Sequence, residues 1–90
     1  MKQQITDFIY SHREDMMEII KQLVEIPSVK GTPEPGAPFG AEPRRALDKM
    51  LEICRRYGFV TGCHDDVMGT ADYDPAGKIG LGILCHLDVV

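Results

Sequence analysis

The chain has 90 residues, of which 43% are hydrophobic and 27% are charged, and its net charge is −4. This length is enough for one small domain with a modest core. Acidic residues outnumber basic ones by 14 to 10, which argues against the basic surface of a nucleic-acid-binding protein. The sequence shows neither an apolar signal segment at its start nor a run long enough to span a membrane, so we expect a cytoplasmic protein with no membrane partner.

Residues 2–26 are predicted to form the first helix, because apolar residues recur there at three- and four-residue steps and make one stripe. Ser11 followed by Glu14 resembles a capping box, so the helix has a candidate break or restart near Ser11. Pro27 disfavours a helical conformation of the residue before it, which ends the helix at this point.

Residues 27–41 are predicted to form a loop, since they hold four prolines and three glycines. Such a segment continues neither a helix nor a strand ladder. It is long for a connection inside a compact domain, so it either lines a site or is a surface loop.

A second helix is predicted over residues 42–57. Pro43 suits the first helical turn, where its missing N–H is not needed, and Gly58 supplies a left-handed stop. The expected buried stripe consists of Ala46, Leu47, Met50, Leu51, Cys54 and Tyr57.

Three strands are predicted over residues 59–63, 67–73 and 79–86. The last segment is nearly continuously apolar, as in a strand that is buried on both faces. The expected fold class is α/β, with two helices packed on a small mixed sheet.

The sequence His86-Leu87-Asp88 is the best candidate for a chemical site. Residues two apart on an extended strand project to the same face, which puts the imidazole beside the carboxylate. A metal-binding histidine commonly donates its second ring N–H to such a carboxylate, which fixes its tautomer. A purely structural histidine–aspartate pair explains the tripeptide equally well.

The other two histidines are expected to be structural. His12 lies on the apolar stripe of the first helix, and His64 lies with two aspartates in a turn between strands. No phosphate-binding glycine loop and no serine nucleophile motif is present.

Taken together, four stretches resemble the start of the aminoacylase, carboxypeptidase G and dipeptidase V superfamily of co-catalytic zinc metallopeptidases, most closely its Xaa-His dipeptidase (carnosinase-like) branch. They are Leu23-Val24-Glu25-Ile26-Pro27-Ser28-Val29, Pro38-Phe39-Gly40, Tyr57-Gly58-Phe59 and Gly82-Ile83-Leu84-Cys85-His86-Leu87-Asp88-Val89-Val90. The family usually has glycine where this chain has Cys85.

The resemblance implies that residues 1–90 are an incomplete N-terminal portion of a larger zinc-peptidase catalytic domain. It implies that His86 is a ligand of one of two metal ions, zinc or else manganese or cobalt. Asp88 is then the catalytic-site carboxylate that orients His86. The substrate would be a dipeptide, hydrolysed by a metal-activated water. An N-acyl amino-acid deacylase of the same superfamily and a non-catalytic α/β association module are the alternatives.

The other functional residues of this family lie beyond its His-x-Asp motif, and this chain ends two residues after the motif. The isolated chain is therefore expected to be inactive as a peptidase. An apolar strand at its C-terminal end would expose unpaired backbone groups, so we also expect the isolated chain to self-associate, through residues 79–90 or by exchanging an element.

Overall fold

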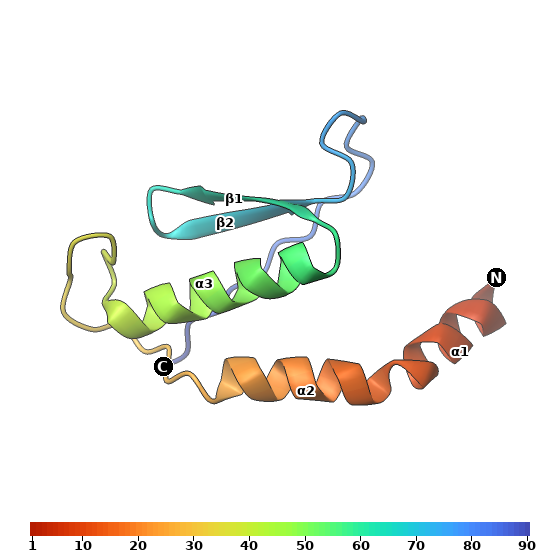
Figure 1. Ribbon diagram of the computed structural model, residues 1–90, viewed down its shortest axis with the longest axis horizontal. Helices are drawn as coiled ribbons and strands as arrows, with labels where there is room; N and C mark the ends of the chain where they lie inside the picture. Colours follow the sequence, from red (N-terminus) through yellow and green to blue (C-terminus); the bar gives the residue numbers. More distant parts are fainter.

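The computed structural model describes residues 1–90 as three helices followed by one β-hairpin (Figure 1). The elements are α1 (Lys2–Ser11), α2 (Arg13–Val24), α3 (Ala41–Arg56), β1 (Val60–His64) and β2 (Met68–Asp72). The α/β class expected from the sequence is confirmed. The hairpin covers one side of α3, and α2 lies on another side of it (Figure 1).

The single helix predicted over residues 2–26 is two helices that meet at His12. Ser11 Oγ donates a hydrogen bond to the carbonyl oxygen of Phe8 at 2.8 Å, and His12 Nδ1 lies 2.8 Å from the same oxygen. These local side-chain bonds compete with the helical ladder and explain the break. Neither helix buries a residue, and α1 projects away from the rest of the molecule (Figure 1).

The proline- and glycine-rich loop closes on itself. Gly31 N–H donates to the carbonyl oxygen of Phe39 at 2.7 Å. Gly40 has a φ of +104°, and a Cβ at this position would lie 3.0 Å from the Gly31 backbone. Only glycine combines this backbone conformation with this close approach. Arg44 of α3 also donates to the carbonyl oxygen of Gly36 at 3.1 Å, which fastens the loop to the start of the helix.

The core lies along α3. Ala46, Leu47 and Leu51 of the predicted stripe are buried there. Tyr57 was predicted to be buried but is 56% exposed, because the helix ends at Arg56 and the chain turns away. Ile53 was not predicted and is buried.

The hairpin packs on α3 through a glycine. A Cβ added at Gly69 would lie 2.8 Å from Cδ2 of Leu51 and 2.9 Å from Cδ1 of Leu47. The absent side chain lets strand β2 approach the helix closely. Between the strands, Asp65 and Asp66 adopt φ values of 54° and 60°, as in a type I′ turn.

The third strand, predicted over residues 79–86, is not formed, and the sheet is therefore antiparallel rather than mixed. A strand needs a neighbouring strand, and no segment of the chain pairs with these residues. Near the end of the chain, one isolated parallel bridge joins Val29 to Val89.

The molecule is less compact than its length allows. Its radius of gyration is 15.1 Å, against roughly 12 Å for a compact domain of this length. None of the helices combines the length and the apolar character that a membrane span requires.

Candidate functional site

The His86 and Asp88 side chains lie side by side, the arrangement that their spacing predicts. Nδ1 of His86 is 3.4 Å from Oδ1 of Asp88 and 3.1 Å from the Asp88 carbonyl oxygen. The side chains are 84% and 68% exposed, so neither is enclosed by apolar groups. The site therefore has open space on its solvent side.

The contacts of His86 define which ring nitrogen is free. Both atoms that approach Nδ1 are acceptors, the carboxylate and the carbonyl of Asp88. Two acceptors beside Nδ1 favour the neutral tautomer that carries its proton on Nδ1. The lone pair then lies on Nε2, which has no partner in the chain and is the nitrogen able to bind a metal ion.

Ser28 holds this site in place, although the sequence analysis assigned it no role. Its hydroxyl donates to the carbonyl oxygen of Leu87 at 2.9 Å, and its own carbonyl accepts from Val89 N–H at 3.0 Å. Ser28 is only 2% exposed. Its place directly after Pro27, in a stretch that resembles the family, was the one available signal.

The chain supplies few further metal ligands. It contains no group of three or more histidine, cysteine, aspartate or glutamate side chains placed to hold a metal ion. A zinc site in a protein needs three or four protein ligands. The imidazole nitrogen of His86 suits zinc, and Asp88 is placed to orient it, so the pair fits one part of such a site and not the whole of it.

The other histidines lie elsewhere. His12 stacks on Phe8 with ring centroids 4.1 Å apart, at the joint between α1 and α2. His64 Nε2 is 3.1 Å from Thr70 Oγ1 across the hairpin. Neither side chain joins the His86–Asp88 pair.

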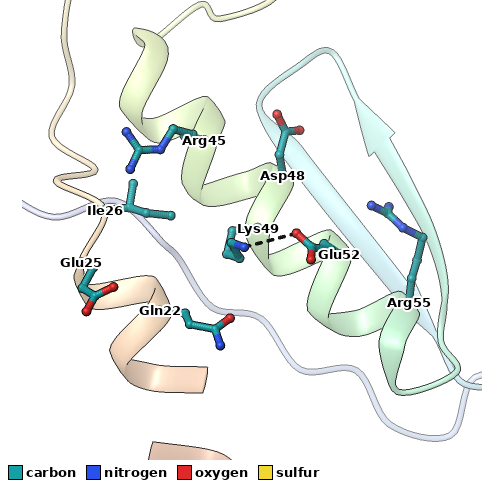
Figure 2. Close-up of a pocket in the computed structure, with 8 residues that line it drawn as sticks. All are labelled: Gln22, Glu25, Ile26, Arg45, Asp48, Lys49, Glu52 and Arg55. Carbon is teal, nitrogen blue, oxygen red and sulfur yellow. Dashed lines mark hydrogen bonds and ion pairs between the residues drawn. The ribbon is translucent and has the colours of Figure 1, made fainter. Parts of the chain in front are cut away.

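A groove between α2 and α3 is a concave feature away from this pair (Figure 2). Its charged side chains largely neutralise one another, as Lys49 and Glu52 do at 3.3 Å. It includes neither His86 nor Asp88. The lining residues are Gln22, Glu25, Ile26, Arg45, Asp48, Lys49, Glu52 and Arg55.

The sequence comparisons show a dipeptidase-like relationship. Proteins named "Putative dipeptidase" from Staphylococcus aureus strains USA300, NCTC 8325 and COL are each 37% identical to this chain over 84 residues. The match covers 91% of this chain and 18% of each relative, so the chain spans about a fifth of the length of these curated proteins. No protein-family model matches the chain.

Proposed function

We propose that this chain supplies one metal ligand, His86, and its orienting carboxylate, Asp88, to a dipeptidase that uses two zinc ions. Manganese and cobalt are the alternative metals. The observation that carries the proposal is the free Nε2 of His86, left open because Asp88 occupies Nδ1. The similarity to staphylococcal proteins named as dipeptidases gives the reaction class. The parent protein is proposed to be cytoplasmic and to be a metallopeptidase.

The residues of this chain have defined tasks in that proposal. Asp88 holds the proton on Nδ1 and fixes the plane of the ring, which raises the basicity of Nε2. Ser28 anchors the backbone on which both side chains lie. Zinc ions held there would supply polarisation of a peptide carbonyl and a lowered pKa of a water molecule, which is the chemistry that amide hydrolysis needs.

The 90-residue chain alone is proposed to be inactive as a peptidase and to bind zinc weakly. One imidazole and one orienting carboxylate leave at least two ligand positions of a zinc ion unfilled. The rest of the catalytic domain would provide them.

A chimera tests the proposal directly. The matching segment of a staphylococcal relative is replaced by this chain, and hydrolysis is measured with dipeptides and with N-acyl amino acids in the presence of zinc. We expect dipeptide hydrolysis that falls by at least about 100-fold in the His86→Ala chimera, because a lost ligand removes one metal ion. His64→Ala is the matched control and should retain full activity.

A second measurement does not depend on the folding of a chimera. Zinc added to the 90-residue chain should shift the ring resonances of His86 in NMR spectra before those of His12 and His64. Tight stoichiometric zinc binding by the chain, or zinc-induced shifts at His64 alone, would contradict the proposal. A chimera that hydrolyses only N-acyl amino acids would favour the deacylase alternative.

A further inference from the structure

Residues 78–86 form an apolar segment without partners. Their backbone makes no hydrogen bond within the chain, on either edge. The side chains of Ile79, Leu81 and Ile83 are 86%, 81% and 85% exposed. In Figure 1 this segment is the pale violet line that leads to the C-terminus. Its composition is that of a buried strand, but its side chains and backbone groups are exposed.

The uncovered area is large for a chain of this size. The accessible surface is 7437 Å², whereas a compact monomer of this mass exposes roughly 5,200 Å². The excess of about 2,200 Å² is more than the roughly 800 Å² that each partner buries in a standard interface. This excess belongs to the whole chain, including α1 and α2, and it leaves surface available for an interface between two copies.

The backbone leaves one edge of this segment available along its whole length. Leu87 and Val89 direct their carbonyl and N–H groups toward Ser28. In a strand, the backbone groups of alternate residues point to opposite edges. In a dimer that extends residues 78–88 as a strand, the even-numbered residues, from Lys78 to Asp88, would present their backbone groups to the edge away from Ser28.

We propose that two copies of this chain pair through this edge, as antiparallel strands related by a two-fold axis at Ile83. This register places Ile83 opposite Ile83 of the second copy. It also places Lys78 opposite Asp88 of the second copy, so opposite charges meet at both ends of the paired region. The apolar side chains of Ile79, Leu81, Ile83, Cys85 and Leu87 all lie on one face of the two-stranded ribbon.

The charge distribution favours this occupant. The chain carries a net charge of −4, which opposes contact between most surfaces of two copies. Residues 79–85 carry no charge, so this segment approaches its own copy without repulsion. A two-fold interface uses the same patch on both subunits, and an apolar strand edge is complementary to itself.

Cross-linking at single positions tests the register. The native cysteines, all free, are replaced by serine, and Ile83→Cys is introduced. Facing residues of antiparallel strands have Cα atoms about 4.5–5.5 Å apart, which a disulfide can bridge. Leu84→Cys is the matched control, equally exposed and one residue away. Its two copies lie diagonally across the axis, with Cα atoms about 8 Å apart, beyond the reach of a disulfide.

We expect mild oxidation to convert most of the Ile83→Cys chain to a covalent dimer, with at least a fivefold lower yield for Leu84→Cys. Sedimentation of the unmodified chain should show a dimer that Ile83→Lys converts to a monomer. Val67→Lys, in the hairpin turn, should leave the dimer intact. A monomer at all concentrations up to hundreds of micromolar overturns the proposal. Equal cross-linking at positions 83 and 84, or a dimer that survives Ile83→Lys, overturns it as well.

Discussion

Ser28 and Leu87 are 59 residues apart in sequence and share a hydrogen bond of 2.9 Å in a part-buried position. The bond runs from a serine hydroxyl at the start of the proline-rich loop to a carbonyl inside the His-x-Asp tripeptide. A second bond, from Val89 N–H to the Ser28 carbonyl at 3.0 Å, lies beside it. These two bonds, and not a strand ladder, position His86 and Asp88.

Replacing this serine should loosen the candidate site. In Ser28→Ala the Leu87 carbonyl loses its partner, so we expect the free energy of unfolding to fall by about 1 kcal/mol. The Val89 amide should also exchange with solvent faster, because the neighbouring bond is less constrained. Urea denaturation and hydrogen exchange measure the two effects. The exposed Ser11→Ala is the control and should not change exchange at Val89. Unchanged protection of the Val89 amide in Ser28→Ala would contradict the assigned role.

The second long helix could be predicted from the sequence because its signals are local. Apolar spacing within residues 42–57 and the stop at Gly58 correspond to α3 and to a Gly58 φ of +89°. The hairpin strands also appear within one residue of their predicted bounds, since the turn between them has its own local signal at Asp65 and Asp66. Local rules were sufficient for these elements.

The rest depends on contacts between distant residues. Residues 79–86 have the composition of a strand, but composition does not provide the neighbour that a strand needs. For the same reason the apolar stripe of α1 and α2 is predicted correctly as a helix pattern yet remains exposed. In the candidate site, His86 and Asp88 lie side by side as expected, although the strand on which that expectation rested is not formed. The anchor at Ser28 did not, because no local pattern joins it to Leu87.

The close approach of Gly69 to α3 predicts that even a methyl group destabilises the fold. Gly69→Ala places a Cβ 2.8 Å from Leu51 Cδ2, which forces the leucine to move. We expect a loss of about 1 kcal/mol in the free energy of unfolding, at the low end of the cost of overpacking, because the crowded atoms are the ends of leucine side chains. Gly80→Ala, with nothing within 4 Å of its Cβ, is the control for loss of glycine itself. Combining Gly69→Ala with Leu51→Ala should cost less than the sum of the two changes, and strict additivity would show that the crowding is absent.

The Arg44–Asp66 pair predicts a link between α3 and the hairpin turn. Arg44 Nη1 is 2.6 Å from Asp66 Oδ1, and this hydrogen bond is the main reason that the pKa of Arg44 is raised. Arg44→Met should accelerate hydrogen exchange in the turn at Val67. Arg45→Met is the neighbouring control, since Arg45 pairs with Glu42 of its own helix. Equal effects of the two substitutions on the Val67 amide would rule out the link.

Glu52 predicts a loss of stability in acid. Hydrogen bonds from Lys49 and then from Arg56 lower the pKa of its carboxyl group below the ordinary value. A lowered pKa in the folded chain means that the stabilisation is present above the ordinary pKa of about 4.3. It is lost as the pH falls through the lowered folded value. The stability difference between the native chain and Glu52→Gln should therefore be constant near neutral pH and vanish in acid. Urea denaturation across this pH range measures it, and in a Lys49→Met background the pH-dependent difference should shrink.

The contacts of His86 predict the position of its proton. Because Nδ1 faces two acceptors of Asp88, neutral His86 should carry its proton on Nδ1, the tautomer that is less common in free imidazole. Nitrogen-15 NMR at a pH where the ring is neutral distinguishes the two tautomers directly. Asp88→Ala removes the carboxylate contact at 3.4 Å and keeps the backbone carbonyl that lies 3.1 Å from Nδ1, so this variant should keep the Nδ1–H tautomer in most molecules. It should still weaken the zinc-induced shift of the His86 resonances, because a nearby carboxylate raises the basicity of the metal-binding nitrogen. His64, whose Nε2 faces Thr70, is the internal reference and should be unaffected by Asp88→Ala. Finding His86 protonated on Nε2 in the native chain would remove the structural basis for its proposed role as a metal ligand.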